Sequence, residues 1–119
     1  MILACGVPRV PYKNGGYIDT PYTITNGKIL TLQRWSFGGQ AYGGGGGKAE
    51  IWWDPDGDMG VNASLITAPA YFEIDYGDRD LNKNYTGNGT ARIVLRVTNN
   101  TPNAGLEFSQ YFDGYESEA

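Results

Sequence analysis

The aspartates of residues 54–60 have the spacing that comes nearest to a chemical site. The segment reads Asp-Pro-Asp-Gly-Asp-Met-Gly, so carboxylates alternate at Asp54, Asp56 and Asp58 around a glycine that permits a tight turn. Alternating carboxylates open calcium-binding loops, in which oxygen ligands converge on a hard cation. The twelve-residue version of such a loop ends on a bidentate glutamate, and this position is Leu65 here. The segment therefore predicts either an irregular site for calcium, the one candidate cofactor, or a plain acidic turn.

The chain contains few residues of the types that commonly act in catalytic sites. The chain contains no histidine and a single cysteine, Cys5. The usual general base, the usual zinc ligand and the Ser-His and Cys-His nucleophile pairs are therefore missing. Glu50, Glu73 and Glu107 fall on the polar faces of expected strands, where a solvated charge is expected. A glycosidase that uses a pair of these carboxylates is therefore the least favoured hypothesis. We predict that the protein is not an enzyme.

Aromatic side chains are the second candidate for function, since the chain holds three Trp, nine Tyr and four Phe. Trp52 and Trp53 are adjacent on an expected strand, so alternation sends them to opposite faces and only one can enter the core. Exposed Trp and Tyr offer flat apolar area with a polar edge, as at protein interfaces and sugar-stacking platforms. The alternative is ordinary half-exposed sheet aromatics. The candidate binding surface consists of Trp52, Trp53, Tyr42, Tyr71, Tyr111 and Tyr115.

Strands must position all these side chains. Residues 90–98 alternate strictly, and residues 71–76, 106–113 and 48–53 follow a similar period of two. Residues 28–37 are also strand-like, with a phase slip that predicts a β-bulge. The 18 glycines and 6 prolines leave no room for a helical period. The core face of residues 90–98 is predicted to hold Ala91, Ile93, Leu95 and Val97.

Turn residues separate these strands at short intervals. Asn26-Gly27 and Gly87-Asn88-Gly89 are typical of tight hairpins, because glycine and asparagine accept positive φ angles. The glycine run at 43–47 predicts a flexible loop, and no Gly-Lys-Ser/Thr ending makes it a phosphate-binding one. We therefore predict an all-β fold, an antiparallel β-sandwich or jelly roll of about seven to eight short strands.

The length and net charge of the chain limit the number of domains and the classes of partner. A chain of 119 residues and 13.0 kDa suits one domain. We expect an extended N-terminal arm at 1–16, the β-sandwich domain at 17–115 and a C-terminal tail at 116–119. Nucleic acid and membranes are not expected partners, because the net charge is −4 and apolar runs are short. A lone cysteine forms no disulfide within the chain, which suits synthesis in a reducing cytosol.

Three stretches carry a resemblance to a known class of proteins. They are Val-Pro-Arg-Val-Pro-Tyr at 7–12, Thr-Gly-Asn-Gly-Thr-Ala-Arg-Ile-Val-Leu-Arg at 86–96 and Tyr-Phe-Asp-Gly-Tyr-Glu at 111–116. In these the chain resembles the small structural proteins of tailed bacteriophages, such as head-decoration, tail or fibre-associated subunits. The resemblance implies a β-sandwich that assembles into symmetric oligomers on a particle surface, and it carries over no catalytic residue.

Two functional hypotheses follow. The first is a non-enzymatic virion structural protein, a capsid decoration or a tail or fibre component. Such a protein is made in the host cytoplasm, is located in the virion, and binds other virion proteins and copies of itself. The alternative is a carbohydrate-binding β-sandwich module in which Trp52 or Trp53 and Tyr42 stack on glycans, with calcium as an optional aid.

Overall fold

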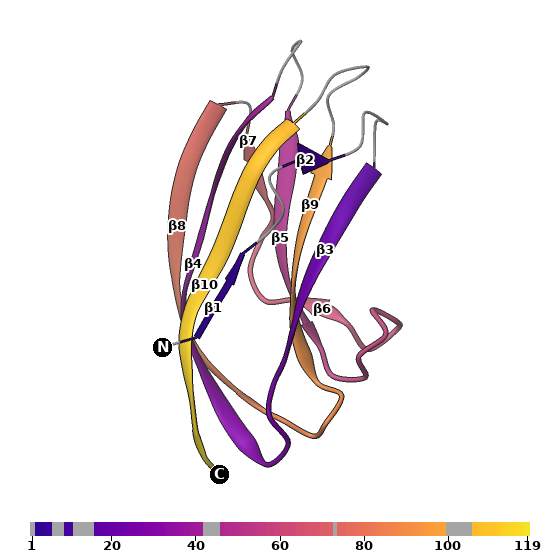
Figure 1. The fold of residues 1–119 in the computed structure, drawn as a ribbon, viewed down its shortest axis with the longest axis vertical. Coiled ribbons are helices and arrows are strands. Elements are labelled where there is room, and N and C mark those ends of the chain that lie inside the picture. Colours follow the sequence, from indigo (N-terminus) through magenta and orange to yellow (C-terminus); the bar gives the residue numbers. More distant parts are fainter. Residues whose placement is uncertain (1, 6–8, 11–15, 42–45, 73, 100–105) are drawn as a thin grey trace.

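The computed structural model describes residues 2–5, 9–10, 16–41, 46–72, 74–99 and 106–119, and Figure 1 presents the fold. In these ranges the chain forms strands and turns and contains no helix, so none of the described residues makes a helix able to cross a membrane. The strands are β1 (Ile2–Cys5), β2 (Arg9–Val10), β3 (Gly16–Thr23), β4 (Lys28–Ala41), β5 (Gly47–Asp54), β6 (Ser64–Leu65), β7 (Ala70–Phe72), β8 (Ile74–Thr86), β9 (Arg92–Asn99) and β10 (Leu106–Glu118).

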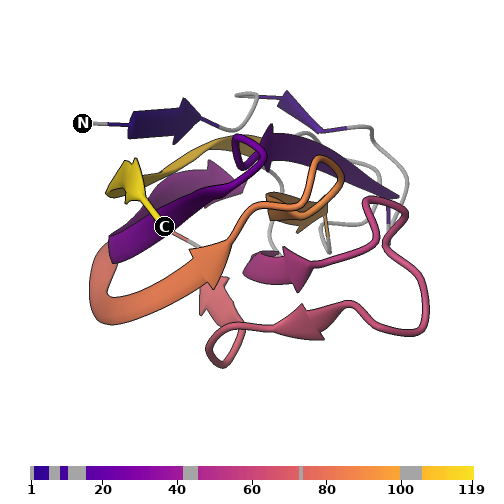
Figure 2. The same cartoon turned by 90° about the horizontal axis from the view of Figure 1, so that it is seen from below.

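The strands form two antiparallel sheets that lie face to face, as Figure 2 shows from below. Sheet A has the order β1-β10-β4-β8, and β2 also pairs with β10. Sheet B has the order β3-β9-β5-β6, and β7 also pairs with β5. The prediction of an all-β antiparallel sandwich is confirmed. The strands differ from the short ones expected, since β4 has 14 residues and β8 and β10 have 13 each.

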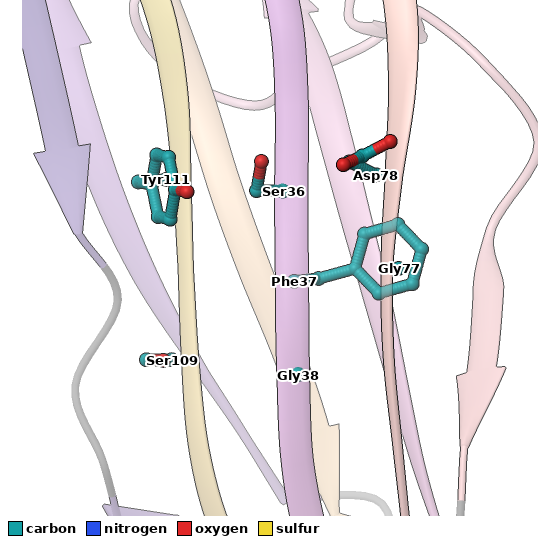
Figure 3. A pocket seen from close by; sticks show the side chains of 7 residues that line it. All are labelled: Ser36, Phe37, Gly38, Gly77, Asp78, Ser109 and Tyr111. Carbon is teal, nitrogen blue, oxygen red and sulfur yellow. The ribbon is translucent and has the colours of Figure 1, made fainter.

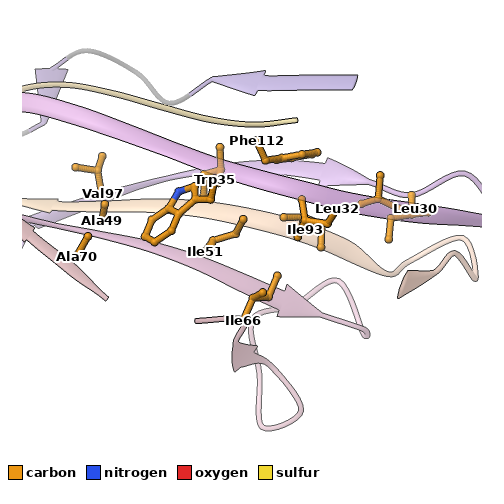
Figure 4. Packing of buried hydrophobic residues seen from close by; sticks show 12 residues of the cluster. Leu30, Leu32, Trp35, Ala49, Ile51, Ile66, Ala70, Ile93, Val97 and Phe112 are labelled. Atoms are coloured by element: carbon orange, nitrogen blue, oxygen red, sulfur yellow. The ribbon is translucent and has the colours of Figure 1, made fainter. Parts of the chain in front are cut away.

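The core lies between the two sheets (Figure 4). Sheet B contributes the predicted face of β9, whose Ile93, Leu95 and Val97 are at most 1% exposed. Sheet A contributes Trp35 and Phe112, both fully buried. Burying a side chain of this kind stabilises the fold by about 1.5–3 kcal/mol, so the facing apolar rows hold the sheets together. The remaining core members are Ile24, Leu30, Leu32, Ala49, Ile51, Ile66 and Ala70.

The predicted bulge in β4 is confirmed. The register between β4 and β8 shifts between Leu32 and Arg34. Leu30 and Leu32, at even positions, and Trp35, at an odd position, can therefore all point into the core. An extra residue in one strand of an antiparallel pair produces this change of phase.

The two predicted hairpins are wrong, because both turns carry the chain from one sheet to the other. Asn26-Gly27 joins β3 of sheet B to β4 of sheet A, and residues 87–89 join β8 of sheet A to β9 of sheet B. The turns themselves are tight, with Gly27 and Gly89 at positive φ. They also bind each other, since Gly27 N donates to Gly87 O at 3.1 Å and Gly87 N to Lys28 O at 2.8 Å. The turn residues reverse the direction of the chain, but they do not determine which strand pairs with the next one.

The segments expected to form an N-terminal arm (1–16) and a C-terminal tail (116–119) pair within sheet A where the structure describes them. β1 pairs with β10 from Ile2 opposite Gly114 onward, and β2 pairs with the start of β10. At the other end β10 continues to Glu118, which is opposite Lys28 of β4. One edge of β10 thus pairs with β1 and β2, and the other edge pairs with β4 along its whole length. The glycine-loop prediction falls largely on 42–45, outside the described residues.

The stretch 71–76, predicted as one strand from its alternation, belongs to two strands. β7 ends at Phe72 in sheet B, and β8 begins at Ile74 in sheet A. Further along β8, two basic side chains reach the connection between β6 and β7 of sheet B: Arg79 donates to the carbonyl of Ala68, and Lys83 Nζ donates to that of Ile66 at 2.9 Å. These bonds tie the two sheets together along this side of the sandwich.

Candidate functional site

The outer face of sheet B collects aromatic and charged side chains in register. Tyr17 of β3, Thr98 of β9, Lys48 of β5 and Tyr71 of β7 are direct cross-strand neighbours in one row. The next row holds Asp19, Arg96 and Glu50, and the row after it holds Pro21, Val94, Trp52 and Leu65. Alternation along each strand places these side chains opposite the core. We call this surface the platform: Tyr17, Asp19, Lys48, Glu50, Trp52, Leu65, Tyr71 and Arg96.

Three aromatic rings belong to the platform. Tyr17 and Tyr71 are 54% and 71% exposed, and Trp52 is half-buried. The guanidinium carbon of Arg96 lies 4.1 Å from the ring centroid of Tyr17 and 5.8 Å from that of Trp52. Both distances are within the range of cation–π attraction, which adds about 0.5–1 kcal/mol at exposed sites. Arg96 therefore links two of the three rings and limits their motion.

Charges on the platform are paired. Arg96 Nε and Nη2 donate to the two carboxylate oxygens of Asp19 at 2.7 and 2.9 Å. These hydrogen bonds raise the pKa of Arg96 further, although burial acts in the opposite direction. Lys48 Nζ lies 3.8 Å from Glu50 Oε1. Glu50 is only 6% exposed, so its expected place as a solvated surface charge is wrong. It sits between Arg96 and Lys48, and two basic neighbours allow a carboxylate to be buried.

Asp54, the first candidate metal ligand, is engaged in holding its own loop. It is fully buried and accepts hydrogen bonds from Arg92 Nε at 2.6 Å, from Met59 N at 3.1 Å and from Asp58 N at 3.3 Å. Burial alone would raise the pKa of Asp54, but the hydrogen bonds and the charge of Arg92 outweigh it and lower the pKa. Both carboxylate oxygens thus have protein donors, Met59 N on Oδ1 and Arg92 Nε on Oδ2.

The other two aspartates bind separate partners in the same loop. Asp58 Oδ1 accepts from Gly60 N at 2.8 Å, and Asp56 Oδ2 accepts from Asn62 Nδ2 at 2.6 Å. The structure does not bring the three carboxylates together, and no group of three His, Cys, Asp or Glu side chains among the described residues could hold a metal ion. In this loop the alternating aspartates act as acceptors for turn N–H groups, as aspartates in turns commonly do.

The remaining predicted aromatics are divided between other surfaces. Trp53 turns inward, where its ring lies 4.5 Å from that of Tyr85, so the opposite-face prediction for the two tryptophans is confirmed. Tyr111 and Tyr115 are on the outer face of sheet A, 38% and 46% exposed. Tyr42 lies outside the described residues. Of the five members of the predicted binding surface that the structure describes, it brings Trp52 and Tyr71 together on the outer face of sheet B.

Sequence reasoning missed Tyr17, Asp19 and Arg96 as members of the site. Their alternation was visible, since Tyr17 and Asp19 are two residues apart and Arg96 lies on the polar side of residues 90–98. The missing information was that β3 pairs with β9 and places Asp19 opposite Arg96. Cross-strand pairing between segments 77 residues apart follows from the tertiary fold and has no local signature.

Comparison with known proteins gives a limited result. No family model and no curated protein matches the chain. Among solved structures, one described as "CBM4 structure and function" has a TM-score of 0.39 at 12% identity, covering 98% of this chain and 84% of the other. Another, "Family 16 Carbohydrate Binding Module-2", has a TM-score of 0.38 at 13% identity, covering 88% and 72%. Both TM-scores lie below 0.5, so we base the proposed function on this chain's own side chains.

Proposed function

We propose that the protein is a non-catalytic carbohydrate-binding module that holds a polysaccharide chain against the platform. One observation carries this proposal: Tyr17, Trp52 and Tyr71, on three different strands, border one sheet face around paired charges. Sugar rings have an apolar C–H face and a hydroxyl edge, so they match aromatic rings set among hydrogen-bonding groups. Few other ligands use both features repeatedly along their length.

The layout of the rows supports an extended ligand that crosses the strands. Tyr17 and Tyr71 are at the two ends of one row and are separated by three strand spacings. With strands roughly 4.8 Å apart, the two residues are roughly 14 Å apart, which suits a short run of sugar units. Lys48 and the buried Thr98 lie between them, and the half-buried Lys48 can meet a hydroxyl group of a middle unit.

Charge pairing supports a role for hydrogen bonding over ionic attraction. Arg96 is already bound to Asp19 through two hydrogen bonds, which holds its guanidinium in place. A fixed donor loses little conformational entropy when a ligand binds, and pre-ordering of this kind raises affinity. Arg96 has further N–H groups that it can direct toward a sugar hydroxyl.

Affinity electrophoresis in gels containing β-glucan, xylan or galactomannan tests the proposal. We expect at least one polysaccharide to retard the wild-type chain, and Tyr71→Ala and Tyr17→Ala to weaken binding about tenfold each, since stacking on an exposed ring contributes about 0.5–1.5 kcal/mol beyond area burial. Tyr115→Ala is the matched control, because Tyr115 is an exposed tyrosine on the opposite sheet. Tyr71→Ala and Tyr17→Ala proteins that both migrate like wild type in every gel would overturn the proposal.

A further inference from the structure

The outer face of sheet A carries a hollow that no residue of the platform touches. It has a volume of about 310 Å³, and the residues that line it are Ser36, Phe37, Gly38, Gly77, Asp78, Ser109 and Tyr111 (Figure 3). Tyr111 of β10, Ser36 of β4 and Asp78 of β8 are direct cross-strand neighbours in one row. Ser36 and Gly38 on the middle strand are small, so a depression remains between the ring of Tyr111 on one side and the carboxylate of Asp78 on the other.

Close packing supports the floor from the inner side of the same strands. The ring of Phe37 lies against Gly77, its cross-strand neighbour, so closely that a Cβ at Gly77 would be 2.9 Å from two ring atoms. An aromatic ring that covers a glycine across a strand pair stabilises the local pairing. The shape of the hollow is therefore present before any ligand arrives.

One end of the hollow is bounded by an ion pair. Arg34, two residues before Ser36 on β4, donates from Nε to Asp80 Oδ1 at 3.2 Å. Both side chains project from the same face as Ser36, and a second hollow lined by Gln33, Arg34, Asp80, Asn82 and Asp113 begins beyond them. A ligand that continued along β4 would meet the Arg34 side chain, so the space favours a short ligand or the end of a chain.

The lining groups have a consistent chemistry. Tyr111 supplies an aromatic wall, Ser36 and Ser109 supply hydroxyl groups, and Asp78 supplies an exposed carboxylate with no hydrogen bond to another described residue. A carboxylate accepts two adjacent hydroxyl groups of a sugar ring, while the ring's C–H face lies on an aromatic side chain. Across β10, β4 and β8 the walls are roughly 9.6 Å apart at the backbone, which leaves room for one ring between them.

We propose that this hollow is a second saccharide site, which takes one or two sugar units or the end of a glycan chain. Its volume lies at the lower end of the range for small-molecule sites, in agreement with a ligand of that size. The proposal shares a ligand class with the platform but none of its residues, so either can fail alone. The two sites are on opposite faces of the sandwich, and together they would let one molecule bridge two glycan chains.

Titration of the ¹⁵N-labelled full chain with cellobiose, xylobiose, mannobiose and diacetylchitobiose, followed by amide chemical shifts, tests the second site. We expect at least one disaccharide to shift the amides of 36–38, 78 and 109–111. Asp78→Asn and Tyr111→Ala should each weaken this binding about tenfold, as expected for loss of a hydrogen bond to a charged group or of a stacked ring. Ser36→Ile should abolish it, because the larger side chain fills the floor and suits a strand.

Tyr115→Ala is the matched control for Tyr111→Ala, since both are exposed tyrosines on the same face of β10 and only Tyr111 lines the hollow. Tyr71→Ala separates the two proposals, since it should weaken retardation by polysaccharide and leave the disaccharide shifts unchanged. The second site is excluded if no disaccharide shifts these amides, or if Asp78→Asn and Tyr111→Ala bind as wild type does. Asp78 is exposed, so its variant remains informative if Ser36→Ile fails to fold.

Discussion

The indole Nε1 of Trp35 donates a hydrogen bond of 3.0 Å to Oε1 of Gln110 across two neighbouring strands of sheet A. Both residues are fully buried, so water cannot replace this bond. A polar pair at this depth fixes the inward orientation of both side chains more narrowly than apolar packing would. The large Trp35 ring thereby keeps one position between the sheets that carry the two proposed sites.

We expect Gln110→Leu to lower the free energy of unfolding by about 1–3 kcal/mol, because it leaves the buried indole N–H without its acceptor. Denaturant unfolding measures the loss. In a Trp35→Phe background the same change should cost less, since no N–H is then left unsatisfied. Equal costs in the two backgrounds would contradict a role for the hydrogen bond.

Replacing Arg92 should destabilise the chain most at neutral pH. Arg92→Ala leaves the buried carboxylate of Asp54 without its cation, and we expect a loss of roughly 3 kcal/mol. Because the pKa of Asp54 is lowered in the folded state, its ionised form stabilises the fold fully above the ordinary carboxyl pKa. This stabilisation is lost as the pH falls through the lowered pKa. Wild type should therefore lose stability more steeply than Asp54→Asn as the pH falls below the ordinary carboxyl pKa of about 4. Parallel acid profiles would refute this.

Tyr22 should give the fold a sensitivity to alkali. Burial, followed by the hydrogen bond of 2.6 Å to Glu116 Oε2, raises the pKa of this phenol. A raised pKa stabilises the folded state below the ordinary tyrosine pKa of about 10, and this contribution is lost as the pH rises beyond it. Thermal melts should show that Tyr22→Phe is less stable at pH 8 and loses less on transfer to pH 11. A larger alkaline loss in the variant would contradict the assignment.

Gly87 cannot accept a side chain without moving the corner that joins the sheets. A Cβ there would lie 2.2 Å from the carbonyl oxygen of Thr25 and 2.9 Å from Ile24 Cγ2. We expect Gly87→Ala to destabilise the fold by more than 2 kcal/mol, as overpacking against backbone typically does. Gly27→Ala is the comparison, because it meets nothing within 4 Å and is strained by its positive φ alone. Urea unfolding should rank the Gly87 variant lower.

The loop at 54–60 should not depend on calcium. Asp54 already has a protein donor on each carboxylate oxygen, so binding a cation would require it to give up Arg92 or Met59 N. We expect the same melting temperature in millimolar CaCl₂ and in EDTA. A calcium-dependent rise in melting temperature that Asp56→Asn abolishes would restore the calcium hypothesis.

Local patterns predicted the parts of the fold that depend on single strands. Alternation in β9 identified its buried face, the phase slip identified the bulge near Arg34, and adjacency separated Trp52 from Trp53. The two hairpin predictions failed because a turn residue responds to local φ and ψ, whereas the sheet to which the next strand belongs depends on the whole core.

The candidate site was only partly predictable for the same reason. Exposure of Trp52 and Tyr71 followed from composition and period, but the row that joins Tyr17 to Tyr71 requires the order β3-β9-β5-β7. The buried state of Glu50 and the engagement of Asp54 by Arg92 both arise from neighbours brought by β9. Assembly on a virus particle, the other hypothesis from the sequence, stays a prediction.

Sheet A ends at β8, whose outer backbone edge has no partner strand among the described residues. Such an edge can recruit strands from other chains and start fibrils. Here Asp78, Asp80 and Lys83 put charge along the strand, and Asn82 at positive φ interrupts it beside the bulge of β4. A twisted, charged edge is a poor template for further strands. Many copies held side by side along one polymer would therefore resist fusing into a continuous sheet.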